Sequence, residues 1–269
     1  MSPRNEVTAN FRCVACKDGV RQPFPFSMAF QPIVDIESRT VYAYEALVRG
    51  LEGQSAAAVL CRVTPENRYA FDQSCRVRAI SLAAQLGLAK TEARLSINFL
   101  PRAVLRPSSC IQLTLQTAQI YGLAHDRIIL EMVETEEAPD LDHLRRIVND
   151  YRQRGLKVAL DDFGAAHSGL NLLADLPTDI IKLDKALIRN LSHRSSAMAI
   201  VMAMAKLSRT MGVELIAEGV ETLEEYEALR RCGISLMQGY LFAKPVFEAL
   251  PEVNWPEHFG YSGKLAKVG

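Results

Sequence analysis

Residues 128–163 read IILEMVETEEAPDLDHLRRIVNDYRQRGLKVALDDF, and they contain the unit that decides the fold. Two short apolar runs, 128–133 and 158–163, flank a segment whose apolar residues are Leu144, Ile147, Val148 and Tyr151. This spacing predicts an amphipathic helix, which Gly155 would end. A strand, a helix and a second strand in this order are typical of a parallel α/β sheet.

The same alternation continues on both sides of this unit. Further apolar runs at 28–34, 41–48, 95–100, 180–183, 214–217 and 236–241 predict strands, and helical periodicity occurs at 66–86, 108–121, 195–211 and 223–231. Only residues 35–40 separate the first two runs, which is too short for a parallel crossover and predicts an antiparallel hairpin. The 269 residues are therefore predicted to form an α/β protein, a modified TIM-type (β/α)8 barrel with an antiparallel first hairpin.

The composition limits the partners and the location that we expect. The 31 basic residues balance the 31 acidic ones, so the chain has no net charge to attract a polynucleotide. The longest apolar stretch, 195–205, is too short to span a membrane, and the first residues do not resemble a signal peptide. We expect a cytoplasmic protein with an N-terminal extension (1–25), a barrel domain (26–250) and a C-terminal tail (251–269).

The N-terminal extension contains a Cys-x-x-Cys pair, Cys13 and Cys16. Such a pair can form half of a zinc site or a redox couple, but the other cysteines are scattered singly and complete no ligand set. An ordinary pair of thiols is the favoured interpretation, and the other two stay open.

Polar residues stand near the carboxyl ends of most of the predicted strands. They are Glu45, Asn98, Glu131, Asp161, Asp162, Lys182, Glu218 and Gln238. In a barrel of parallel strands these ends meet at one opening, which is where such barrels place their catalytic groups. Any one of these residues alone is more often a helix cap or a solvated loop residue, but their number favours a common site.

Carboxylate and amide oxygens in such a group suit Mg²⁺ or Mn²⁺. The adjacent Asp161 and Asp162 indicate two ions that share a carboxylate, an arrangement that activates a water molecule and stabilises the leaving oxygen in phosphoester cleavage. Lys182 would orient that water or help to deprotonate it. The pattern predicts a metal-dependent site without naming its substrate.

These residues lie in motifs that resemble the EAL domain family over residues 26–248. The motifs are FQPIVD (30–35), YEALVR (44–49), IN (97–98), LEMVE (130–134), LDDFG (160–164), IKLD (181–184), AEGVET (217–222), QGY (238–240) and KP (244–245). The order of so many motifs makes the resemblance specific. Residues 63–76, VTPENRYAFDQSCR, are similar to EAL domains that accompany blue-light-sensing flavin modules.

The resemblance implies a phosphodiesterase that linearises cyclic di-GMP to 5′-pGpG with two Mg²⁺ or Mn²⁺ ions. By motif, Glu45, Asn98, Glu131 and Asp161 would hold one ion, and Asp161, Asp162 and Glu218 the other. Lys182 would contact the attacking water, with Gln238 and Glu221 as supporting groups, so that Lys182, Glu45, Glu218, Gln238 and Glu221 form the implied catalytic set. Gln31, Leu47, Arg49 and Asp161 would contact the substrate, and Glu134 would support the loop after Asp162. The family also implies a homodimer, and a separate sensor protein is a further possible partner.

One loop departs from the family pattern. Residues 161–168 read DDFGAAHS where DDFGTGYS is usual, and Val133 replaces a usual Thr. The lost glycine and hydroxyl reduce backbone freedom and hydrogen bonding, so turnover could be weak. A receptor that binds cyclic di-GMP without cutting it, because of the altered loop from Ala165 to His167, is therefore the alternative. An unrelated Mg²⁺-dependent barrel enzyme is a third hypothesis, although no glycine-rich phosphate loop supports it.

Overall fold

The computed structural model describes residues 22–132, 140–165 and 170–256. Within these ranges eight strands close into a barrel in the order β2-β3-β4-β5-β6-β7-β8-β1, and β1 pairs again with β2. The strands are β1 (Ser27–Asp35), β2 (Thr40–Arg49), β3 (Arg94–Phe99), β4 (Ile128–Met132), β5 (Lys157–Phe163), β6 (Ile180–Leu183), β7 (Glu214–Ala217) and β8 (Leu236–Gln238). A short strand, β9 (Val246–Phe247), adds to the start of β1. The predicted TIM-type barrel is confirmed.

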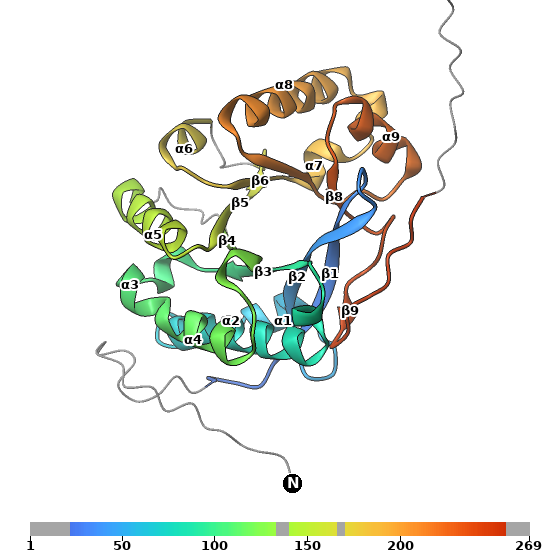
Figure 1. The fold of residues 1–269 in the computed structure, drawn as a ribbon. Helices are drawn as coiled ribbons and strands as arrows, with labels where there is room; N and C mark the ends of the chain where they lie inside the picture. Colours follow the sequence, from blue (N-terminus) through green and yellow to red (C-terminus); the bar gives the residue numbers. More distant parts are fainter. Residues whose placement is uncertain (1–21, 133–139, 166–169, 257–269) are drawn as a thin grey trace, which may run out of the picture.

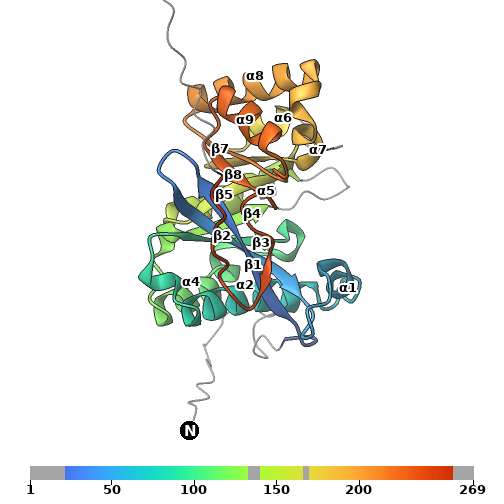
Figure 2. The same ribbon diagram turned by 90° about the vertical axis from the view of Figure 1, so that its right-hand side faces the viewer.

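The strand directions define one functional rim. Each neighbouring pair from β2 to β8 is parallel, whereas β1 is antiparallel to both β2 and β8. Ser27 at the start of β1 therefore lies opposite Arg49 at the end of β2. We call this rim, made of the carboxyl ends of β2 to β8 and the start of β1, the mouth. Figure 2 shows the long β1–β2 hairpin in blue.

Helices surround the strands, with α2 and α4 on one side of the barrel and α8 and α9 on the other (Figure 1). The helices are α1 (Ala56–Leu60), α2 (Arg68–Gln85), α3 (Pro107–Cys110), α4 (Gln112–Ile120), α5 (Leu141–Gln153), α6 (Leu170–Asp175), α7 (Lys185–Ile188), α8 (Ser195–Met211) and α9 (Leu223–Arg231). Short 3₁₀ turns lie at Leu88–Lys90, Pro101–Ala103, His125–Arg127 and Leu191–His193.

Helix α5 forms for the reasons that its sequence indicates. The side chain of Asp140 accepts a hydrogen bond from the amide of His143 at 3.1 Å and caps the first turn. The four apolar residues of the predicted stripe are all buried against the sheet. Gly155 follows with a φ of +83°, a conformation that glycine adopts without strain.

Most predicted elements agree with the observed ones to within two residues at each end, but two differ more. The helix expected at 108–121 is divided into α3 and α4 at Ile111, although the backbone there stays helical, with φ −81° and ψ −17°. The strand expected at 236–241 ends at Gln238. Its carbonyl accepts a hydrogen bond from the amide of Val220, in the loop after β7, at 3.0 Å. That loop takes the place of a neighbouring strand, so the ladder stops.

The barrel interior is layered. An apolar cluster of Ile33, Tyr42, Ala43, Ile129, Ala159, Ile180, Ile216 and Leu236 fills the end away from the mouth. Because side chains on one face of a strand recur every second residue, the next inward position on each strand lies one layer closer to the mouth. Those positions are the polar residues that the sequence analysis singled out.

Candidate metal centre

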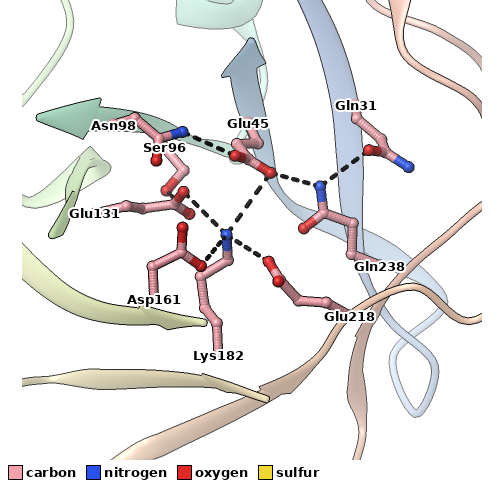
Figure 3. Close-up of polar contacts among 9 residues, drawn as sticks. All are labelled: Gln31, Glu45, Ser96, Asn98, Glu131, Asp161, Lys182, Glu218 and Gln238. Atoms are coloured by element: carbon pink, nitrogen blue, oxygen red, sulfur yellow. Dashed lines mark hydrogen bonds and ion pairs between the residues drawn. The ribbon is translucent and has the colours of Figure 1, made fainter. Parts of the chain in front are cut away.

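The layer nearest the mouth is a connected group of polar side chains (Figure 3). It consists of Gln31, Glu45, Ser96, Asn98, Glu131, Asp161, Lys182, Glu218 and Gln238. All eight strands of the barrel, or the residues directly after them, contribute, so positions far apart in the sequence become neighbours. The structure brings together the predicted strand-end residues as the parallel topology requires.

Lys182 lies at the centre of this group and is 1% exposed. Its Nζ is 2.5 Å from Glu218 Oε1, 2.9 Å from Glu131 Oε2, 3.2 Å from Asp161 Oδ1 and 3.7 Å from Glu45 Oε2. One ammonium group thus faces four carboxylates in a buried site. These contacts raise the pKa of Lys182 well above its usual value against the opposing effect of burial, so it stays charged.

Two amide side chains, Asn98 and Gln238, hold Glu45, and a third, Gln31, contacts Gln238. Asn98 Nδ2 donates to Glu45 Oε1 at 2.9 Å, and Gln238 Nε2 donates to Glu45 Oε2 at 2.7 Å. Gln238 Nε2 also contacts Gln31 Oε1 at 3.2 Å, and Gln31 donates to the carbonyl of Ala243 at 3.1 Å. Since Asn98 uses its nitrogen here, its carbonyl oxygen is the atom left for a cation.

Ser96 is a member of the group that the sequence analysis missed. Its hydroxyl donates to Glu131 Oε1 at 2.5 Å, and the side chain is fully buried. It precedes Asn98 by two residues and therefore shares the inward face of β3. Ser96 lies opposite Glu45 on β2 and Ile129 on β4, and a serine two residues before Asn98 in an otherwise apolar run was the available signal.

A β-bulge turns both adjacent aspartates toward the mouth. The register of β5 against β6 shifts between Leu160 and Phe163, and Asp162 has a φ of +52°. A residue other than glycine in this region costs about 1–3 kcal/mol, and such strain concentrates at functional sites. The result is a cluster in which single oxygens of Asp161, Asp162 and Glu218 all lie within 4.8 Å of one another.

The carboxylates of the site titrate abnormally because they are buried together. Burial and the neighbouring Glu45 raise the pKa of Glu131 well above its usual range, and burial raises the pKa of Glu218 to about 8. Burial and Asp161 raise the pKa of Asp162 to about 6. Burial opposes ionisation of Glu45 as well, but Lys182 and the hydrogen bonds from Gln238 and Asn98 lower its pKa.

The oxygen atoms of this group are suitable ligands for hard divalent cations such as Mg²⁺ and Mn²⁺. Five carboxylates and one ammonium leave four negative charges uncompensated when all are ionised, and this repulsion adds to burial in raising the pKa values of Glu131, Glu218 and Asp162. The donors are all oxygens, as Mg²⁺ and Mn²⁺ prefer. The one cluster of three potential ligands within the described ranges is Asp161, Asp162 and Glu218.

Other predicted residues lie at or beyond the edge of the group. A cavity of about 330 Å³ opens beside it, lined in part by Leu47, Asn98, Asp161 and Asp162. The guanidinium of Arg49 donates to the carbonyl of Val48 at 2.8 Å.

Glu221 is exposed and pairs with Arg189 at 3.0 Å, so its side chain makes no contact that joins it to the group in Figure 3. Glu134, the pair Cys13 and Cys16, and the altered positions Val133, Ala166 and His167 lie outside the described residues.

Comparison with known proteins gives consistent results. A model of the EAL domain matches residues 21–245. The solved structure of a standalone versatile EAL protein from Vibrio cholerae O395, in a c-di-GMP bound form, is 48% identical, with a TM-score of 0.84, and the match covers 87% of this chain and 98% of that one. Klebsiella pneumoniae BlrP1, in a manganese and cy-diGMP complex at pH 9.0, is 34% identical, with a TM-score of 0.81, and covers 87% and 59%.

Two curated relatives are longer proteins. The blue light- and temperature-regulated antirepressor BluF of Escherichia coli (strain K12) is 32% identical over 229 residues, which is 85% of this chain and 56% of BluF. The cyclic di-GMP phosphodiesterase PA2567 of Pseudomonas aeruginosa is 29% identical over 233 residues, which is 84% of this chain and 39% of PA2567. The chain thus spans about half the length, or less, of these relatives. Across the described ranges no helix has both the length and the apolar character that crossing a membrane requires.

Proposed function

Because this chain belongs to the EAL domain family, we propose that it is a metal-dependent phosphodiesterase that hydrolyses cyclic di-GMP to linear 5′-pGpG. The observation that carries the proposal is the buried group in which Lys182 faces four carboxylates. Solved relatives bind cyclic di-GMP, and one of them does so together with manganese. A site of this composition suits phosphoester cleavage assisted by divalent cations.

The chain would hold two Mg²⁺ or Mn²⁺ ions, since two divalent cations neutralise the four excess negative charges. Glu45, Asn98, Glu131 and Asp161 would ligate the first ion, and Asp161, Asp162 and Glu218 the second. When bound, the ions lower the pKa of a water molecule and stabilise charge on phosphate oxygens. Lys182, which stays charged, would orient that water by donating a hydrogen bond from its ammonium group.

The remaining residues would position the substrate and the ligands. Gln31 and Gln238 keep Glu45 oriented through the hydrogen bonds described above. Leu47 would contact the substrate from the cavity wall, and Arg49 would turn from the Val48 carbonyl to a phosphate, whose geometry suits its planar fork. Glu221 would act only through its loop, in which its amide donates to Glu225 Oε2 at 2.9 Å.

The test is turnover by the purified protein. With Mn²⁺ or Mg²⁺ we expect 5′-pGpG to form from cyclic di-GMP, and we expect Glu45→Gln to abolish product while the protein stays folded. Glu37→Gln is the matched control, because Glu37 is exposed in the hairpin turn at the end of the barrel away from the mouth. No product at any metal concentration, with the ligand bound, would refute the proposal and support a receptor.

The receptor is a second candidate for a specific reason. BluF shares 32% identity with this chain and is named an antirepressor, and the loop that begins at Ala165 departs from the family pattern. Equilibrium binding of cyclic di-GMP followed by product analysis separates the two functions. The homodimer, the separate sensor protein and the cytoplasmic location stay predictions.

A further inference from the structure

A buried ion pair on α2 has no part in the function proposed above. Asp72 and Arg76 lie one helical turn apart, 2% and 0% exposed, with Asp72 Oδ2 3.0 Å from Arg76 Nη2. Both belong to the segment 63–76 that resembles EAL domains found with blue-light-sensing modules. They pack outside the barrel, on the side that α2 covers.

Stability alone does not explain why the chain keeps this pair. Removing two charges from water costs several kcal/mol each, and a well-packed apolar pair of the same volume is often as stable or more stable. The pair is also incompletely satisfied, since Nε and Nη1 of Arg76 have no hydrogen-bond partner among the described residues. The ion pair is better explained by a neighbouring group whose position it fixes.

The second carboxylate oxygen of Asp72 contacts the backbone at the end of β3. Asp72 Oδ1 accepts a hydrogen bond from the backbone amide of Leu100 at 2.9 Å. Leu100 directly follows β3 and is two residues beyond Asn98, whose side chain donates to Glu45 inside the barrel. Arg76 thus holds the carboxylate of Asp72, and this carboxylate holds the backbone at the end of β3. Because Asn98 lies in the same strand, its position depends on that contact.

We propose that Asp72, held by Arg76, is a positioning residue that fixes Asn98 and thereby sets the affinity of the mouth for divalent cations. The proposal rests on the proposed function, because it takes Asn98 as a metal ligand. Groups that orient a ligand from behind it typically contribute 10–100-fold to metal affinity. Asp72 also lines the cavity beside the site, but its hydrogen bond goes to the backbone that follows β3, so its role toward the metal is that of a positioning residue.

The first test removes the pair without leaving a buried charge. The double variant D72L/R76M replaces both groups by apolar side chains, and we expect it to fold with a melting temperature near that of the unaltered protein. Its Mn²⁺ affinity, measured by the electron paramagnetic resonance signal of free Mn²⁺, should fall by about 10–100-fold. The measurement needs neither substrate nor turnover.

The second test removes only the hydrogen-bond donor. Leu100→Pro deletes the amide N–H but leaves Asp72 and Arg76 in place, and because the φ of −100° at this position must shift by about 20° to reach the proline range, its melting temperature is measured as well. Leu100→Ala removes the same side chain and keeps the N–H. We expect Mn²⁺ to bind weakly to Leu100→Pro and normally to Leu100→Ala.

The outcomes separate this inference from the proposed function. Unchanged Mn²⁺ affinity in folded D72L/R76M, or equal affinities in the two Leu100 variants, would overturn the positioning role. If the unaltered protein binds Mn²⁺ and the variants lose it, but no protein hydrolyses cyclic di-GMP, only the proposed function fails. If the unaltered protein binds no Mn²⁺, both are wrong.

Discussion

Replacing Lys182 by methionine tests the charge arrangement of the mouth most directly. The side chain is 1% exposed and lies within 3.7 Å of four carboxylates, so the variant removes the single cation that compensates them. Breaking a buried ion pair costs about 3–5 kcal/mol. For a domain of this size each kcal/mol lowers the melting temperature by about 2–4 °C, so we expect a fall of roughly 6–20 °C at pH 8 in EDTA.

Divalent cations should reverse much of that loss, because they supply the positive charge that Lys182 provided. We expect Mn²⁺ to raise the melting temperature of Lys182→Met by more than it raises that of the unaltered protein. Turnover should still fall by at least about 10²-fold, since the water would lack the ammonium group that orients it. Differential scanning calorimetry with and without Mn²⁺, and product analysis, measure both effects.

The matched control is Lys206→Met on α8, where the lysine is exposed and far along the chain from the mouth. It should change stability by less than about 0.5 kcal/mol. A melting temperature of Lys182→Met in EDTA equal to that of this control would refute the reasoning. Turnover within tenfold of the unaltered protein would refute the role of Lys182 in catalysis.

Three further changes are testable. In EDTA the free energy of unfolding should fall as the pH rises from about 4.5 to about 8 and level off above that, because the pKa of Glu218 is about 8 in the folded protein and about 4.5 in the unfolded one. Thermal unfolding should show a smaller dependence on pH for Glu218→Gln. Gly239→Ala would place a Cβ 2.0 Å from the Val220 carbonyl oxygen, so we expect a loss of at least about 1–3 kcal/mol in denaturant titrations and weaker turnover through displacement of Gln238. Restoring the family pattern with Ala165→Thr and Ala166→Gly should leave turnover unchanged or raise it, and a lower rate would contradict the loop argument.

Much of the fold can be predicted from two local properties of the sequence, the helical periodicity of apolar residues and the length of the connection between the first two strands. Helical period predicts residues 195–211 and 223–231 with the bounds that α8 and α9 have, because each helix buries one mainly apolar face. The short connection between the first two runs predicts the antiparallel β1. Parallel topology then places Glu45 beside Asn98, although the two are 53 residues apart.

What could not be predicted depends on contacts between distant elements. An ion pair four residues apart on a helix, such as Asp72 with Arg76, is usually solvated, and only the packing of α2 shows that this one is buried. The bulge at Asp162 requires a backbone angle that aspartate rarely adopts, so local preference opposes it. Glu221 follows its motif in sequence, yet Arg189 holds its side chain elsewhere.

The reversed direction of β1 determines at which end of the barrel the chain enters. In a barrel whose strands all run one way, the polypeptide begins at the floor, opposite the reacting groups. Here Ser27 lies opposite Arg49, so the chain enters the barrel on the side where the carboxylates gather. A displacement of β1 would therefore move Gln31, which contacts the same Gln238 side chain that donates a hydrogen bond to Glu45. The start of β1 is therefore connected to the predicted metal ligand Glu45 through only two side chains, Gln31 and Gln238.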